Sequence, residues 1–223
     1  MKKVMQLIGI GLLSAVSASA AQNDHRPTAF MVSDAHLDTQ WNWDIQATIG
    51  HHIRATLEQN LALMRHYPDY IFNFEGAVKY YWMKEYYPQY WQELTQRIRE
   101  NRWHLAGSRW DANEVIICSP ESWIRNILLG QTFYRQEFGT ESNDVFLPDC
   151  FGFPYYMPTA ATHCGLIGFS SQKLMWRTSP FYEDGKKYPF TVGLWQGIDG
   201  SRIMMTHGFN YAQRYDEQDL SYN

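Results

Sequence analysis

Short apolar runs alternate with longer amphipathic segments along most of the chain. Residues 29–33 form an apolar run of β-forming side chains, which predicts a short buried strand. The next apolar residues recur at helical spacing, at Ile49, Ile53, Leu57, Leu61 and Met64. This spacing predicts an amphipathic helix that ends before Pro68. Residues 70–74 then predict a second strand, so the first part of the chain is expected to form a βαβ unit.

The same alternation continues toward the C-terminus. Two helical segments, residues 78–87 and 90–100, are separated by Pro88 and followed by a strand at residues 103–107. The helix predicted over residues 119–138 begins with Ser-Pro, a typical N-cap and first-turn pair. A strand, a short helix and a strand are predicted next, at residues 145–147, 158–164 and 168–172.

Residues 191–196 and 202–206 flank a Gly-Ile-Asp-Gly-Ser turn, which predicts an antiparallel hairpin. Elsewhere, strands that alternate with helices predict an α/β fold with a mainly parallel sheet and right-handed crossovers. In such folds the active site gathers beyond the C-terminal ends of the strands. Polar residues of the predicted strand ends are Asp34, His36, Asp38, Glu75, Asp111, Glu114, Asp149 and Lys173.

The first of these strand ends suggests a metal site. His36 and Asp38 alternate on an extended segment, so both side chains can point to one side, and imidazole with carboxylate is a ligand pair for zinc or a similar cation. A histidine that only hydrogen-bonds to a nearby acid would give the same pattern. Trp41 favours the functional interpretation because its ring could form the floor of a small pocket.

Asp149 follows a proline at another strand end and precedes a Phe-Gly-Phe turn. A carboxylate held by this stiff backbone could be a metal ligand and a nucleophile, or simply the N-cap of a helix. Phe151 and Phe153 could line a site or pack in the core.

Composition limits the class of protein. The 223 residues are 45% hydrophobic and 16% aromatic, which predicts a globular fold, and the many aromatic rings suit either a large core or contacts with sugars. A formal net charge of −4 gives no basic surface for nucleic acid or membranes. The cysteines Cys118, Cys150 and Cys164 are odd in number and lack C-x-x-C spacing, so neither a disulfide framework nor a zinc knuckle is indicated.

The N-terminus predicts export. Lys2 and Lys3 precede an apolar run over residues 7–16 and then Ala-Ser-Ala, which is typical of a signal peptide over residues 1–20. No later segment is long and apolar enough for a membrane span, so a soluble, periplasmic or extracellular protein is expected. Residues 211–223 are polar and without a pattern, so we expect residues 21–223 to be an incomplete domain.

Several motifs together resemble a known family. They are His-Leu-Asp-Thr-Gln-Trp at residues 36–41, Leu-Pro-Asp-x-Phe-Gly at 147–152, Ser-Gln-Lys-Leu-x-Trp at 171–176, Trp-Gln-Gly-Ile-Asp-Gly-Ser-Arg at 195–202, and the Gly-Gln to Phe-Gly run at 130–139. In this order they resemble the N-terminal catalytic domain of glycoside hydrolase family 38, the retaining α-mannosidases. The resemblance covers nearly all of the chain after the predicted signal peptide.

The resemblance implies a partial parallel (β/α) barrel of the seven-stranded type that holds a Zn²⁺ ion and acts on mannose-containing glycans. It implies that His36, Asp38 and Asp149 are zinc ligands, that Asp149 is also the nucleophile, and that Trp41 and Phe151 shape the sugar pocket. In that family the zinc coordinates mannose hydroxyls. The family's acid/base aspartate and fourth zinc ligand, a histidine, would lie beyond residue 223, so activity of this chain alone is an open question.

Two other functions compete with this interpretation. A metallophosphoesterase often begins with a strand and Asp-x-His, as at Asp34 and His36, but it also needs Gly-Asp-x-x-Asp and Asn-His, which the sequence lacks. A non-catalytic carbohydrate-binding protein would fit the aromatic content and the missing acid. His207 is assigned a structural or pocket-rim role, and His51 and His52 are expected on the first helix.

Overall fold

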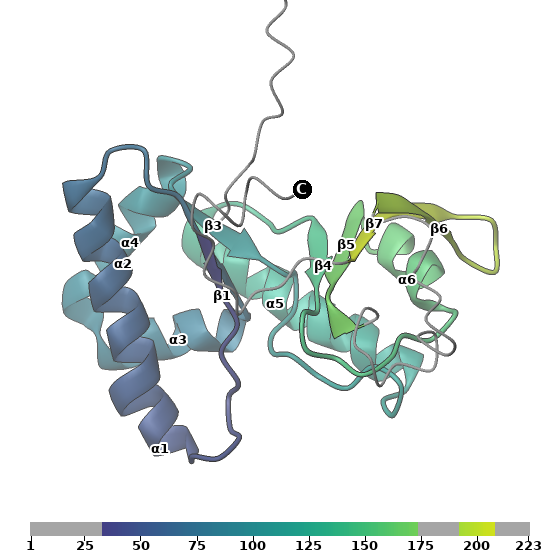
Figure 1. Cartoon of the computed structure of the whole chain (residues 1–223), viewed down its shortest axis with the longest axis horizontal. Coiled ribbons are helices and arrows are strands. Elements are labelled where there is room, and N and C mark those ends of the chain that lie inside the picture. The colour runs from purple at the N-terminus through teal and green to yellow at the C-terminus, as the bar shows by residue number, and fades with distance from the viewer. Residues whose placement is uncertain (1–32, 174–191, 208–223) are drawn as a thin grey trace, which may run out of the picture. The chain divides into compact units, whose positions relative to one another are not determined.

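The computed structural model describes residues 33–173 and 192–207, which form two sheets with helices packed against them (Figure 1). The first sheet is parallel and has the order β1 (Ser33–Ala35), β2 (Phe72–Glu75) and β3 (Trp103–Ala106). The strand predicted at residues 29–33 overlaps β1 at Ser33, and residues 29–32 lie outside the described part of the chain. Asp34 does not follow β1 but lies within it, opposite Asn73.

The connection between β1 and β2 is one long helical segment. It consists of α1 (Ile45–Ala47), a π-helical stretch η1 (Thr48–Ile53) and α2 (Arg54–His66). Asp44 caps its start by accepting a hydrogen bond from Ala47 N at 2.8 Å. The helix therefore begins earlier than the apolar spacing predicted, because the cap and the first turn contribute no buried apolar residue.

Two further helices cross from β2 to β3, namely α3 (Ala77–Tyr86) and α4 (Pro88–Arg99). Pro88 does not stand between them as a separator but is the first residue of α4, where its missing N–H costs nothing. Aromatic residues of the sheet form the core under these helices, and the rings of Phe72 and Trp103 meet edge to face at 4.9 Å. Burial of each such side chain contributes about 1.5–3 kcal/mol to stability.

The longest helix, α5 (Pro120–Phe138), links the two sheets and begins and ends as predicted. Ser119 caps it by accepting a hydrogen bond from Ser122 N at 3.1 Å, and Gly139 ends it in the left-handed conformation with φ of 69°. Gly130 allows α5 to approach the loop after β3 closely, since a Cβ there would lie 2.4 Å from the backbone carbon of Arg109.

The second sheet has the order β4 (Asp144–Phe146), β5 (Gly168–Ser171), β7 (Arg202–His207) and β6 (Val192–Gln196). The pairs β4–β5 and β5–β7 are parallel, and β6 and β7 form the predicted antiparallel hairpin. The short helix α6 (Met157–His163) precedes β5.

The predicted class, α/β with mainly parallel strands, is confirmed. The described strands lie in two separate sheets, so closure into a seven-stranded barrel stays a prediction. Residues that follow β3 nevertheless reach the start of β4, because Gly107 N donates to Asp144 Oδ1 at 2.9 Å and Ser108 N donates to Asp144 O at 3.1 Å.

Several predictions concern residues outside the described part of the chain. These are the signal peptide at residues 1–20, the end of the 171–176 motif and the polar segment at 211–223. Among the helices that are described, none has the length and apolar character needed to cross a bilayer.

Candidate functional site

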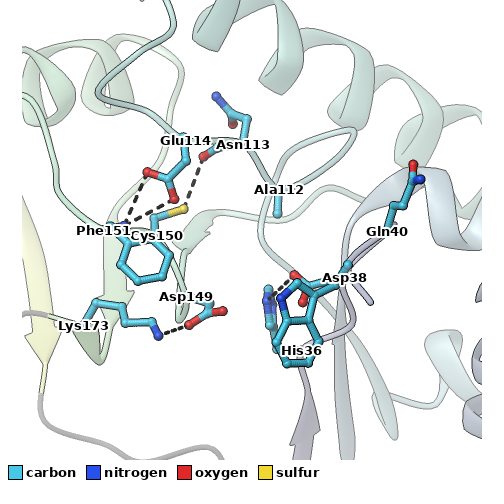
Figure 2. Close-up of a pocket in the computed structure, with 11 residues that line it drawn as sticks. His36, Asp38, Gln40, Ala112, Asn113, Glu114, Asp149, Cys150, Phe151 and Lys173 are labelled. Carbon is cyan, nitrogen blue, oxygen red and sulfur yellow. Dashed lines mark hydrogen bonds and ion pairs between the residues drawn. The ribbon is translucent and has the colours of Figure 1, made fainter. Parts of the chain in front are cut away.

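A pocket of about 540 Å³ lies at the C-terminal ends of strands from both sheets (Figure 2). The structure brings all of the predicted site residues to its wall, namely His36, Asp38, Trp41, Asp149 and Phe151. The first three follow β1, and the last two follow β4. Polar residues that follow two different strands, His36 and Asp38 after β1 and Asp149 after β4, thus meet in one pocket.

Three side chains in the pocket could hold a metal ion. His36, Asp38 and Asp149 each offer one ligand atom, and these atoms all lie within 4.8 Å of one another. Within residues 33–173 and 192–207, no other group of histidine, cysteine or acidic side chains meets this condition. Residues more than a hundred positions apart thus form a single donor set.

The His36 ring is held from behind by a buried carboxylate. Its Nδ1 hydrogen-bonds to Glu75 Oε1, and its Nε2 lies 3.2 Å from Asp38 Oδ1. Only 7% of the His36 side chain and 1% of the Glu75 side chain are exposed. Burial lowers the pKa of His36, but the hydrogen bond and negative charge of Glu75 outweigh burial and leave that pKa raised.

The pKa of Glu75 is lowered despite its burial. Burial alone would raise its pKa, but the hydrogen bond from His36 and the positive charges of Lys79, His36 and Arg109 outweigh burial, and the pKa is lowered. The Arg109 side chain is itself only 2% exposed and places Nη2 3.3 Å from Glu75 Oε2. The sequence indicated Glu75 as a strand-end acid but gave no sign of its arginine partner.

Asp149 lies in a more open setting on the opposite wall. Its Oδ1 forms an ion pair with Lys173 Nζ, and 26% of its side chain is exposed. The same ammonium lies 4.6 Å from the centre of the Phe151 ring. Glu114 fixes the turn because Phe151 N donates to both of its carboxylate oxygens, at 3.3 Å to Oε1 and 3.4 Å to Oε2.

The donor set fits a divalent cation in both chemistry and charge. One imidazole and two carboxylates are common ligands of zinc and related metals. Because Glu75 occupies Nδ1 of His36, the ring presents Nε2 toward Asp38. A carboxylate behind the ligating histidine is a common feature of such sites.

Two large aromatic rings are exposed at the pocket. Trp41 and Phe151 are each 69% exposed, which is unusual for side chains that could otherwise be buried. Trp41 is supported by Trp43, whose ring meets it edge to face at 5.6 Å. Rings presented in this way can stack against the apolar face of a sugar.

Other polar positions play different parts. Glu114 lines the pocket, whereas Asp111 accepts a hydrogen bond from Thr39 Oγ1 at 2.5 Å and lies 3.5 Å from Lys79 Nζ. His207 is buried at the end of β7 and does not line the pocket. His51 and His52 lie on η1, also outside the pocket lining. Pocket residues that the sequence did not reveal are Gln40, Ala112, Asn113 and Cys150.

Comparison with known proteins gives the family. Residues 26–223 match the N-terminal domain of the glycosyl hydrolases family 38. The chain belongs to glycosyl hydrolase family 38. This membership confirms the family resemblance of the motifs and disfavours the metallophosphoesterase alternative.

Relatives within family 38 are much longer than this chain. It is 32% identical over 200 residues to alpha-mannosidase G of Dictyostelium discoideum, covering 90% of this chain and 18% of the relative. It is 31% identical over 177 residues to the alpha-mannosidase of Saccharomyces cerevisiae, covering 79% of this chain and 16% of the relative. The chain thus spans less than a fifth of the length of these family 38 relatives.

A solved structure supports the family 38 fold. The crystal structure of an alpha-mannosidase from Enterococcus faecalis V583 superposes with a TM-score of 0.64 at 18% identity, over 79% of this chain and 19% of that one. At this identity the likeness supports the arrangement of helices and strands.

Proposed function

We propose that this chain is the N-terminal part of the catalytic domain of a zinc-dependent, retaining α-mannosidase that hydrolyses terminal α-mannosides of glycans. Family membership and the two relatives named above support the substrate class. The observation that carries the proposal is the convergence of His36, Asp38 and Asp149 in one pocket.

In this proposal, His36 Nε2 and carboxylate oxygens of Asp38 and Asp149 would hold the zinc. When bound, the ion would supply a Lewis acid that coordinates hydroxyls of the mannose and so positions the sugar. Trp41 and Phe151 would stack against the sugar, because their exposed rings face the same pocket. A fourth ligand is expected from a histidine that follows residue 223.

Asp149 would be the nucleophile. One carboxylate oxygen attacks the anomeric carbon while the bond from that carbon to the leaving oxygen breaks, and an acid contributed from beyond residue 223 protonates the leaving oxygen. The same acid, now a base, takes a proton from water as the water displaces Asp149, so mannose is released with its configuration retained. Lys173 supports this role because its ammonium holds the Asp149 carboxylate in place.

The wider architecture is part of the proposal. We infer that the parallel strands of the two sheets belong to one incomplete seven-stranded barrel, which the hydrogen bonds from Gly107 and Ser108 to Asp144 support.

We also infer export through a signal peptide over residues 1–20. Mass spectrometry of the exported protein should then find an N-terminus at Ala21, and an uncleaved N-terminus would contradict this inference.

The nucleophile is tested by replacing Asp149 in the full-length protein. Asp149→Ala should reduce hydrolysis of an aryl α-mannoside by about 10⁴-fold or more, because a covalent step is lost. A control, Glu58→Gln, changes a surface acid that pairs with Arg54 and should leave activity unchanged. A slowly hydrolysed fluorinated mannoside should add one sugar to the peptide that contains Asp149, as read by mass spectrometry.

An unimpaired Asp149→Ala enzyme would remove Asp149 from the nucleophile role. Inversion of the product's anomeric configuration, followed by NMR, would exclude the retaining mechanism. A wild-type protein that binds mannosides but never hydrolyses them would instead support the carbohydrate-binding alternative.

A further inference from the structure

A buried ionic group lies behind the pocket and includes none of the proposed ligands. Glu75, the last residue of β2, contacts His36 Nδ1 with Oε1 and lies 3.3 Å from Arg109 Nη2 with Oε2. Both oxygens of this carboxylate therefore have a fixed partner. Because its side chain is 1% exposed, water cannot easily take the place of either partner.

Arg109 connects this carboxylate to the other wall of the site. Its Nη2 also donates to Phe146 O at 2.7 Å, and Phe146 is the last residue of β4. Asp149 follows three residues later in the chain. One buried guanidinium thus contacts the strand that ends before Asp149 and the acid that holds His36.

The contacts of Glu75 determine which ring nitrogen of His36 carries the proton. Arg109 places its guanidinium beside the carboxylate, with Nη2 3.3 Å from Glu75 Oε2, and both side chains are almost completely buried. An ionised carboxylate only accepts hydrogen bonds. Asp38 also places a carboxylate oxygen 3.2 Å from Nε2, but the Nδ1 contact with Glu75 is shorter and is a hydrogen bond, so we expect a neutral His36 ring to carry its proton on Nδ1 and its lone pair on Nε2.

We propose that Glu75 and Arg109 are positioning residues for the metal site: Glu75 sets the tautomer and orientation of His36, and Arg109 ties that ring to the backbone before Asp149. The inference rests on the proposed metal-dependent function. Residues that orient a ligating histidine commonly change metal affinity about 10–100-fold when they are replaced.

Glu75→Gln tests the tautomer, because the amide cannot satisfy both neighbours as the carboxylate does. Arg109 only donates hydrogen bonds, so the Gln oxygen should face Arg109 and the NH₂ group should face His36 Nδ1. The His36 proton then moves to Nε2, the atom that the metal needs. Nitrogen NMR of the metal-free protein, at a pH where the ring is neutral, should show Nδ1–H in the wild type and Nε2–H in the variant.

Zinc affinity, measured by competition with a chelator, gives the second readout. Glu75→Gln should bind zinc about 10–100-fold more weakly than the wild type. Glu93→Gln is the matched control, because Glu93 pairs with Arg65 on the surface. The zinc affinity of this variant should equal that of the wild type. Arg109→Lys keeps the positive charge but cannot span both partners, so it should weaken zinc binding and leave the Nδ1–H tautomer intact.

The outcomes separate this inference from the proposed function. A folded Glu75→Gln protein with an Nδ1–H tautomer and wild-type zinc affinity would overturn the positioning role and leave the metal site standing. A wild-type protein that takes up no zinc would contradict the metal site, while the tautomer in the metal-free protein still decides the role of Glu75. If Glu75→Gln does not fold, an Nε2–H tautomer in the wild type overturns the inference, and Nδ1–H in the wild type with weakened zinc binding in Arg109→Lys supports it.

Discussion

The two walls of the pocket differ in how deeply their acidic groups are buried. On the His36 wall, the imidazole ring is held by Glu75, which pairs with Arg109, and both of these side chains are almost completely buried. On the Asp149 wall, the carboxylate is about a quarter exposed and is held by Lys173 and by a turn that Glu114 anchors. The first wall is held by buried ionic contacts, and the second leaves its carboxylate accessible from the pocket.

This difference predicts which kind of effect a substitution will have. Breaking a buried ion pair leaves an uncompensated charge away from water, so it should reduce stability. Breaking the Asp149–Lys173 pair leaves a carboxylate that water can reach, so it should reduce activity more than stability.

The largest expected effect is on the stability of the buried wall. Arg109→Met removes the guanidinium and leaves Glu75 ionised and buried, which should lower the free energy of unfolding by about 3–5 kcal/mol. Denaturant unfolding followed by circular dichroism measures this change. Arg125→Met, which breaks a surface pair with Glu121, is the control and should change stability by less than about 1 kcal/mol.

The comparable substitution on the open wall should act on catalysis. Lys173→Met removes a charged partner worth about 1.5–3 kcal/mol, so activity of the full-length enzyme on an aryl α-mannoside should fall about 10–100-fold. Lys173→Arg should recover much of this activity. A Lys173→Met enzyme that is fully active but as unstable as Arg109→Met would contradict the division between the walls.

Asn126 holds the loop that follows β3. Its side chain accepts from Asp111 N at 3.1 Å and donates to Asp111 O at 2.9 Å and to Asn113 Oδ1 at 3.0 Å. Asn126→Ala should cost about 1–2 kcal/mol, because only part of the loop is buried. Thermal unfolding measures the loss, and an unchanged melting temperature would show that the loop is held by other contacts.

The smallest effect is expected at Asp199, an exposed acid in the turn between β6 and β7. Asp199 accepts hydrogen bonds from Thr159 Oγ1 at 2.7 Å and from Ser201 Oγ at 2.7 Å, and with Ser201 N these bonds lower its pKa below the usual 3.8. Its contribution to stability is therefore present above pH 3.8 and is lost as the pH falls toward the lowered pKa. Asp199→Asn should lower the melting temperature slightly at neutral pH.

Thermal scans of Asp199→Asn and the wild type from neutral to acid pH provide the check. The two melting temperatures should converge as the pH falls below 3.8, because the wild-type carboxylate then gains its proton. A difference that stays constant with pH would show that the charge of Asp199 makes no contribution.

Local patterns in the sequence predicted much of the fold. Ser119 and Pro120 indicated where α5 begins, and the turn between β6 and β7 indicated the hairpin, because caps and turns depend on neighbouring residues. The π-helical stretch η1 was not predicted, since its six residues keep an apolar spacing close to that of an α-helix. Strand bounds also shifted at β1, where pairing with β2 extends the strand through Ala35.

Site residues could be predicted only where a strand end carries residue types that are typical of metal ligands. His36, Asp38 and Asp149 could be named because they follow predicted strands, but their proximity depends on how the two sheets pack. Arg109 could not be recognised, because an arginine in a polar loop usually faces water. Its burial between Glu75 and Phe146 is a property of the tertiary structure.

The most direct test of the account is zinc binding by single variants of the three proposed ligands. The wild type should bind zinc at one site, and His36→Ala, Asp38→Ala and Asp149→Ala should each weaken it strongly in calorimetric titrations. His52→Ala, outside the pocket, should bind like the wild type. Wild-type affinity in both His36→Ala and Asp149→Ala would contradict the claim that the two walls share one metal ion.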